Sequence, residues 1–278
     1  MELTSQHKQT ENTGEAIYLY CLAHADFLSS VAGTGVDERY AITLLRRHDI
    51  VAVWSKVSLD DFCGVTAPSK LKDIAWVGPR ACRHEKVVEQ IMSQSPVLPT
   101  RFGTIFSSFA GLEKLLEKHH DEVLQFLSQV SEREEWSVKG FLDRDRAKEE
   151  LLALEFSKQK KHLALLSPGK RYFQEQQIRK TVEQELNNWL QEICNGIAES
   201  LNHSATDFSE RTVLSRNATG MDMDMILNWA FLVPQEVTAA FHTLIDKANK
   251  DHDCHGLMFV LSGPWPPYSF CPTLDTLT

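Results

Sequence analysis

The chain has 278 residues, of which 42% are hydrophobic, and a formal net charge of −9 with an isoelectric point of about 5.7. This length exceeds the usual size of a single hydrophobic core, and the apolar content suffices for packed cores, so we expect two folded domains. The acidic balance argues against a nucleic acid or an anionic lipid membrane bound by bulk electrostatic attraction.

The six cysteines are scattered along the chain and form no CxxC pair, which is ordinary usage in a reducing compartment. Residues 1–14 are polar, so we expect a disordered leader and no secretory signal there. No apolar run approaches the roughly 18 residues of a membrane span. These features predict a soluble, cytoplasmic protein.

The first half of the chain predicts an α+β domain over residues 15–131, a modified ferredoxin-like antiparallel sheet with helices on one face. A buried strand is expected at 16–22, followed by a loop of small residues where a ferredoxin-like fold would have its first helix. The further predicted elements are strands at 39–45 and 50–57, a polar connection at 58–70, a helix at 73–92, a strand at 96–106 and a helix that begins at Ser107 or Ser108 and carries apolar residues from Leu112 to Leu127.

The second half predicts another α+β domain over residues 132–262. A strand at 136–142 precedes about sixty residues of helical pattern, which Ser167 and Pro168 interrupt as the N-cap and first residue of a new helix. We therefore expect a hairpin of two long helices at about 143–203. The remaining pattern is two strands at 208–216 and 223–233, a helix that opens at Pro234, and a strand at 257–261. The order corresponds to a ferredoxin-like antiparallel sheet with helices on one face and a lengthened first crossover.

Three prolines and three aromatic residues lie together near the end of the chain, within Gly263–Phe270. Proline fixes φ and removes a backbone donor, so we expect Gly263 to end the preceding strand and an extended tail to occupy residues 263–278. Burying an aromatic side chain is worth roughly 1.5–3 kcal/mol. We predict that Trp265, Tyr268 and Phe270 dock this tail, either on the protein's own surface or on a partner.

Enzyme and metal motifs are incomplete. The Gly169-Lys170 pair lacks the rest of a phosphate-binding loop, and His84-Glu85 lacks the second histidine of a zinc-protease helix. The best local set of metal ligands is His252, Cys254 and His255, with no second cluster to complete it. We therefore expect no catalytic residues, no metal and no cofactor.

Arginine, histidine and phenylalanine side chains form one further candidate group in the first domain. Arg101 and Phe102 lie in the predicted edge strand, and Arg80, Arg83 and His84 share one side of the predicted 73–92 helix. Arginine beside a large aromatic ring is typical of interaction surfaces. Arg80, His84, Arg101 and Phe102 are thus candidate partner-binding residues. The alternative is a semi-buried arginine that pairs with a carboxylate and holds the domain together.

Several of these segments together resemble the gas vesicle accessory protein F/L family (GvpF/GvpL). The strand Pro96–Phe106 is close to that family's PVLPLRFGTLF, and Gly263–Phe270 matches its GPWPPYSF terminus. Weaker similarities are found at Ile74–Glu85, at Trp136–Lys139, where Ser137 replaces a glycine, and at Ser167–Tyr172. The matches run in order from about residue 17 to residue 270.

The resemblance implies a non-enzymatic role in gas vesicle assembly. It implies as partners the small hydrophobic shell protein (GvpA-like) and other gas vesicle accessory proteins, during nucleation or early growth. From the acidic charge we expect no nucleic acid and no lipid membrane among the partners. A partner for a hydrophobic subunit needs apolar anchors and a polar rim. Two alternatives remain open: a ferredoxin-like ligand-binding regulator or enzyme that uses the Arg80, His84 and Arg101 region, and a protein that self-associates through its helical hairpin.

Overall fold

The computed structural model describes residues 14–65, 67–252 and 255–274. The chain forms two compact units. Unit 1 contains residues 1–131 and returns with residues 266–278, whereas unit 2 contains residues 132–265. The expectations for residues 1–13 and for Cys254 lie outside the described residues.

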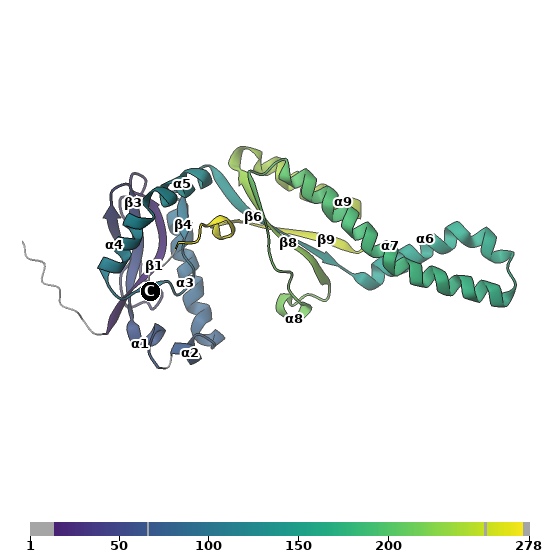
Figure 1. The fold of residues 1–278 in the computed structure, drawn as a ribbon, viewed down its shortest axis with the longest axis horizontal. Helices are drawn as coiled ribbons and strands as arrows, with labels where there is room; N and C mark the ends of the chain where they lie inside the picture. The colour runs from purple at the N-terminus through teal and green to yellow at the C-terminus, as the bar shows by residue number, and fades with distance from the viewer. Residues whose placement is uncertain (1–13, 66, 253–254, 275–278) are drawn as a thin grey trace, which may run out of the picture. The chain divides into compact units, whose positions relative to one another are not determined.

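The sheet of unit 1 is antiparallel and has the strand order β2-β3-β1-β4 (Figure 1). Because the two central strands come first and third in the sequence, this is the order of a ferredoxin-like sheet, as predicted. The short strand β5 (Ile105–Phe106) also pairs with β1, beyond the end of β4. The main strands are β1 (Glu15–His24), β2 (Thr43–Arg47), β3 (Ile50–Ser58) and β4 (Val97–Pro99).

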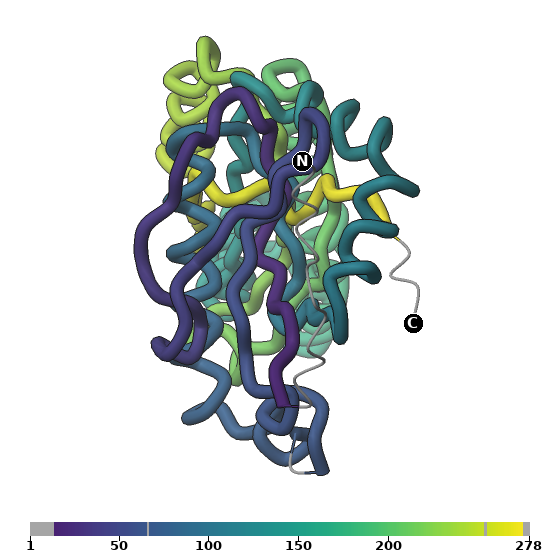
Figure 2. The backbone as a smooth tube through the Cα atoms, turned by 90° about the vertical axis from the view of Figure 1, so that its left-hand side faces the viewer, coloured from purple at the N-terminus to yellow at the C-terminus, as the bar shows by residue number. Residues whose placement is uncertain are grey.

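Helices cover both faces of this sheet, whereas helices on one face were predicted, because α4 and α5 pack against the face opposite α3. Tyr18 of β1 contacts His84 of α3 (Ile74–Met92), and Trp54 of β3 contacts Phe109 of α4 (Phe109–Lys118) with ring centroids 4.8 Å apart. Figure 2 shows the strands in front, with α4 and α5 (His120–Val130) along one side. Residues 16–23 of β1 are consequently all buried. As predicted, a loop takes the place of the first ferredoxin-like helix between β1 and β2.

Unit 2 repeats the same strand order, β7-β8-β6-β9, again antiparallel throughout. The predicted fold class, two α+β domains with ferredoxin-like antiparallel sheets, is confirmed. The elements are β6 (Arg133–Leu142), α6 (Arg144–Ala164), α7 (Pro168–Asn202), β7 (Asp207–Glu210), α8 (Arg216–Thr219), β8 (Asp224–Pro234), η1 (Gln235–Val237), α9 (Thr238–His252) and β9 (Leu257–Trp265).

The predicted helical hairpin is present as α6 and α7. The Asp143 carboxylate caps α6 by accepting from the Arg146 amide at 3.1 Å, and Ser167 with Pro168 begins α7. Away from the sheet the two helices have a small core of their own. Its buried residues are Leu163, Ile178 and Val182, with Leu151, Leu152, Phe156 and Leu166 packed against them.

Several predicted boundaries were wrong in unit 1. The single strand at 96–106 is two strands, because Thr104 donates to the Arg101 carbonyl at 3.1 Å and Gly103 has φ +86°, which makes a turn between them. The predicted helix after Ser108 breaks at His119 into α4 and α5. The polar connection at 58–70 contains two short helices, α1 (Leu59–Phe62) and α2 (Ala67–Lys70).

In unit 2 the strand predicted at 208–216 ends at Glu210, and the last strand is longer than predicted. Gly263 does not end β9, which continues to Trp265 opposite Glu135. A register shift between Glu135 and Ser137 accommodates the Gly263-Pro264 step at the sheet edge, where a missing backbone donor is tolerated. Gly263 itself has φ +143°, and a Cβ there would lie 2.8 Å from the Glu135 carbonyl oxygen.

We predict that Gly263→Ala destabilises unit 2 by roughly 1–3 kcal/mol, because an L side chain is strained at this φ and collides with backbone. The matched control is Gly196→Ala in α7, where a Cβ meets nothing within 4 Å. Alanine there should stabilise the helix by about 0.5–1 kcal/mol. Urea unfolding of both variants measures the difference. Equal midpoints would contradict the strain assigned to Gly263.

Candidate functional site

His84 is the most tightly held of the candidate residues. It lies on α3, which Asp73 caps by accepting from the Ala75 amide at 2.9 Å, and it is only 2% exposed. Its Nδ1 lies 3.0 Å from the Tyr18 hydroxyl, and its Nε2 lies 3.1 Å from the Thr100 carbonyl and 3.2 Å from the Tyr268 hydroxyl. One imidazole thereby joins β1, α3, the β4–β5 connection and the returning tail.

The partners determine which nitrogen carries the proton. The Gly103 amide donates to the Tyr18 hydroxyl at 3.0 Å, which leaves the Tyr18 proton for His84 Nδ1. The Thr100 carbonyl can only accept, so Nε2 is the protonated nitrogen. The network is therefore complete with a neutral imidazole.

The Tyr268 hydroxyl closes the network on the tail side. It donates to the Glu85 carboxylate at 3.0 Å, so its oxygen is available to accept from His84 Nε2. Burial and the neighbouring Glu85 carboxylate raise the pKa of Tyr268, and burial raises the pKa of Tyr18, partly offset by the Gly103 amide. Both phenols therefore stay protonated as donors.

Burial lowers the pKa of His84 to about 4, and the Thr100 carbonyl only partly opposes this. With both ring nitrogens engaged and a neutral ring, His84 has no free group to offer a ligand at neutral pH. The geometry makes it a structural connection inside unit 1.

The other predicted partner-binding residues lie closer to the surface. Phe102 is half-buried, with its ring 6.1 Å from that of His84 and 6.3 Å from that of Phe62, whereas Arg101 is exposed. The Arg80 guanidinium lies 4.1 Å above the Trp76 ring, and its Nη1 donates to the Trp76 carbonyl at 3.0 Å.

Pairing with a carboxylate was the alternative expected for Arg101, but the arginine that makes an ion pair in this region is Arg83. This side chain donates to Glu38 at 2.7 Å and to the Val36 carbonyl at 2.9 Å, and so attaches α3 to the loop between β1 and β2. Among the described residues, no ion pair is seen for Arg101. Arg101 is thus exposed and takes no part in this pair, and its role in partner binding stays a prediction.

The three aromatic residues of the tail have different surroundings. Trp265 ends β9 in unit 2, where its side chain is 39% exposed and its indole N–H donates to Ser262 Oγ at 3.2 Å. Tyr268 and Phe270 belong to the short helix η3 (Tyr268–Phe270) in unit 1 and are half-buried. The buried Pro267 and the Cys271 thiol, which lies 3.6 Å from the Pro99 carbonyl, continue the contact of the tail with unit 1.

Sequence reasoning missed most partners of His84. Tyr18 lies in β1 and reads as an ordinary strand residue, Thr100 contributes only its backbone carbonyl from the β4–β5 connection, and nothing local connects either of them to residue 84. The apolar run of β1 gave one signal, because it predicts a buried strand and a tyrosine hydroxyl on a buried strand needs a polar partner. That partner could not be identified without the tertiary fold.

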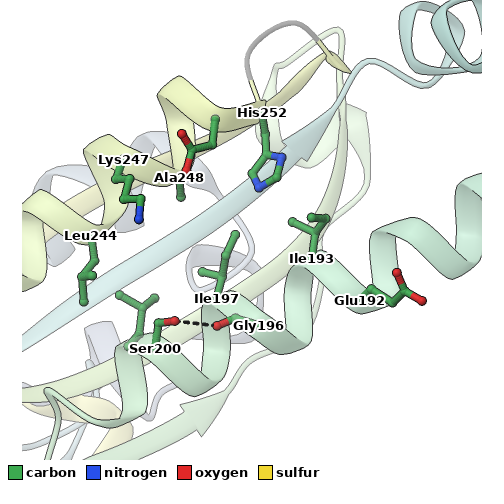
Figure 3. Close-up of a pocket in the computed structure, with 11 residues that line it drawn as sticks. Glu192, Ile193, Gly196, Ile197, Ser200, Leu244, Lys247, Ala248 and His252 are labelled. Carbon is green, nitrogen blue, oxygen red and sulfur yellow. Dashed lines mark hydrogen bonds between the residues drawn. The ribbon is translucent and has the colours of Figure 1, made fainter. Parts of the chain in front are cut away.

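Unit 2 has a cavity of about 250 Å³ between α7 and α9 (Figure 3). Ile193 and Ile197 line it from α7, and Leu244, Lys247, Ala248 and His252 line it from α9. Of the residues considered as metal ligands and not expected to bind one, His252 and His255 have ring centroids 6.3 Å apart and both contact the Trp189 ring, while Cys254 lies outside the described residues. Among described residues, no group of three or more acidic, histidine or cysteine ligands comes together.

The burial of His84 predicts a pH dependence of stability. The folded-state pKa of about 4 lies below the ordinary value of 6.5, so the unfolded chain binds more protons between these values. The stabilisation is therefore complete above pH 6.5 and is lost as pH falls towards 4. Between pH 7 and pH 5 we expect His84 alone to reduce the free energy of unfolding by about 2 kcal/mol.

Urea unfolding at both pH values tests this, with His84→Gln as the control, because glutamine keeps a donor and an acceptor but does not titrate. The variant should lose about 2 kcal/mol less than the wild type over the same pH interval. An identical loss in both proteins would mean that His84 is not the titrating group.

We expect the hydrogen bonds of the Tyr268 hydroxyl to stabilise the folded protein. Tyr268→Phe keeps the ring but removes the contacts with Glu85 and His84, which should cost about 1–3 kcal/mol. Tyr172→Phe, at a side chain 66% exposed in α7, is the matched control and should change little. Differential scanning calorimetry of the two variants measures this. A Tyr268→Phe protein that melts like the control would show that the tail contact contributes no stability.

None of the described helices is long and apolar enough to cross a membrane. The family described as Gas vesicle synthesis protein GvpL/GvpF matches residues 16–272. Gas vesicle protein L of a Streptomyces species is 26% identical over 230 residues, which cover 82% of each chain. Gas vesicle protein L1 of Halobacterium salinarum is 23% identical, over 98% of this chain and 95% of its own length.

Solved structures give the same result for the fold. The crystal structure of GvpF from Anabaena has a TM-score of 0.66 at 21% identity and covers 93% of this chain and 97% of its own. GvpF from Microcystis aeruginosa has a TM-score of 0.62 at 20% identity and covers 93% and 99%. With a match that spans nearly all of both units, the chain belongs to the GvpL/GvpF family of gas vesicle synthesis proteins.

Proposed function

We propose that this protein is a non-enzymatic accessory factor in gas vesicle assembly. The observation that carries the proposal is the family match over residues 16–272, which includes both units and the returning tail. The relatives named gas vesicle protein L align over most of their own length, so the likeness is not confined to one shared domain. The protein would act in association with the gas vesicle.

The proposed partners are the small hydrophobic shell protein and other gas vesicle accessory proteins. A factor that holds a hydrophobic subunit before it is incorporated needs exposed apolar side chains beside polar ones. Such a group lies in unit 1 and is here called the α3 surface. It consists of Leu71, Ile74, Trp76, Arg80 and Arg101.

The exposure of these side chains supports the choice. Ile74 is 86% exposed and Leu71 is 44% exposed, although both are large and apolar. Trp76, with Arg80 stacked on it, gives the kind of aromatic and arginine anchor that dominates many interfaces. An apolar partner segment would cover Ile74 and Leu71 and leave the guanidinium of Arg80 at the rim.

Arg101 is related to this group through the next residue and a series of ring contacts that ends at Trp76. Phe102, its neighbour in the chain, lies 6.3 Å from the Phe62 ring, and Phe62 lies 5.3 Å from the Trp76 ring. In this proposal His84 and Phe102 do not touch the partner. They support the backbone of α3 and of the β4–β5 connection that present the exposed residues.

The alternative function, a ligand-binding regulator or enzyme at Arg80, His84 and Arg101, has less support. It requires a group that can titrate or coordinate beside an accessible pocket. His84 is buried and neutral, with both nitrogens hydrogen-bonded, and Arg80 is stacked on Trp76. The cavity between α7 and α9 is lined by none of these residues.

The assembly role predicts that the protein retains the shell protein when both are expressed in the same cells. Replacing Ile74 by Ser together with Arg101 by Ala should reduce the amount retained at least about fivefold, because an apolar anchor and a rim charge are lost. The matched control is Phe27→Ser, which removes an apolar side chain 61% exposed elsewhere in unit 1. Affinity capture followed by quantitation of the shell protein gives the result.

Near-ultraviolet circular dichroism verifies that each variant is folded. If the wild type retains no shell protein, the proposal that it binds this partner is wrong. If the double variant retains as much as the Phe27→Ser control, the shell protein binds elsewhere than the α3 surface.

A further inference from the structure

The end of the α6–α7 hairpin, residues 157–173, combines apolar and basic side chains in an unusual way; we call it the hairpin tip. Leu165 is 86% exposed, Tyr172 is 66% exposed and Phe173 is 64% exposed. With a rise of 1.5 Å per residue, all three lie within about 10 Å of the turn along the helix axes. Figure 1 shows the two helices meeting at this turn.

The charge of the hairpin tip is opposite to that of the protein. Five of the 29 basic residues, and none of the 38 acidic residues, fall between residues 157 and 173. Lys158 pairs with Glu155, and Arg171 pairs with Glu175, at the edges of the tip. Lys160, Lys161 and Lys170 are exposed, and the structure gives them no ion pair within the described part of the chain.

The exposed apolar residues are not needed to hold the hairpin together. The hairpin core is made by Leu163, Ile178 and Val182, which are buried between the helices together with the side chains packed against them. Leu165, Tyr172 and Phe173 lie outside that cluster. Three large apolar side chains in water among unpaired cations are typical of a surface that is covered by a partner.

We propose that the hairpin tip binds an acidic segment with an apolar face on a protein partner. This rests on the proposed function only in that the partner takes part in the same assembly. Apolar burial of Tyr172, Phe173 and Leu165 would provide the affinity, and Lys160, Lys161 and Lys170 would select the negatively charged flanks. Tyr and Phe side chains lose little conformational entropy on binding, so they serve well as anchors.

Charge favours a protein segment over an anionic bilayer or a second copy of the chain. A protein with a net charge of −9 is repelled by an extended anionic surface and by its own copies. A short acidic segment meets mainly the charges of the tip, because charges further than about 8–10 Å away are screened at physiological salt. The tip therefore attracts an acidic segment while the rest of the chain interacts with it little.

The test is fluorescence anisotropy of the full-length protein with a fluorescein-labelled amphipathic peptide that has leucine on one face and glutamate on its flanks. A peptide with lysine in place of glutamate is the charge control. We expect the acidic peptide to bind at least about tenfold more tightly than the basic one. Raised salt should weaken the acidic complex.

Two variants locate the binding. The affinity for the acidic peptide should fall at least about tenfold in the charge variant, Lys160→Glu with Lys161→Glu and Lys170→Glu. It should fall as much in the apolar variant, Tyr172→Ser with Phe173→Ser. The matched control for charge is Lys86→Glu with Lys114→Glu and Lys250→Glu, three exposed lysines outside the tip. This control has the same net charge as the first variant and should bind like the wild type.

Equal weakening by the control and tip charge variants would overturn the proposal, because net charge alone would then explain binding. It would also be overturned if phosphatidylglycerol vesicles bind through the tip and the acidic peptide does not, or if sedimentation shows tip-dependent dimers instead. Retention of the shell protein without peptide binding would refute only the tip proposal. Peptide binding without retention would refute only the proposed binding of the shell protein.

Discussion

Unit 1 depends on the hydrogen bonds of one neutral, buried imidazole. Burying a polar ring is unfavourable unless each of its nitrogens finds a partner, and the partners of His84 come from three other segments of the unit. Tyr18 is on a central strand, Thr100 lies beyond β4, and Tyr268 is in the tail. The network is complete only when all three are in place, so it selects one arrangement of α3 against the sheet.

The tail is therefore part of the framework of unit 1, although in the sequence all of unit 2 lies between the tail and the rest of that unit. The Tyr268 hydroxyl is shared between His84 and Glu85, one residue apart on the same helix. Loop closure over the residues of unit 2 costs entropy, but this cost grows only slowly with loop length. A few well-placed contacts, such as those of Tyr268 and Pro267, can offset it.

Local patterns predicted the elements with clear chemistry. Asp73, Ser108 and Ser167 begin α3, α4 and α7 as their residue types indicate, and the strand order of both sheets follows from the order of the predicted elements. The strand at 96–106 was mispredicted because the turn at Arg101–Thr104 depends on Gly103 and on tertiary contacts. The extension of β9 to Trp265 was missed because Pro264 is tolerated only where the Gly263 backbone bends at a sheet edge.

The residues that make the family resemblance are largely the framework and not the exposed surface. His84, Phe102 and Tyr268 lie within the segments that resemble the family, yet each is buried or half-buried and bonded to other parts of unit 1. Changes there act first on folding, so a loss of assembly in such variants would not identify a partner surface. Exposed side chains of the two proposed surfaces include Ile74 and Arg101 in unit 1 and Tyr172 and Phe173 in unit 2. Each pair consists of exposed side chains that make none of the hydrogen bonds of the His84 network, so variants there change a surface without removing a contact that holds unit 1 together.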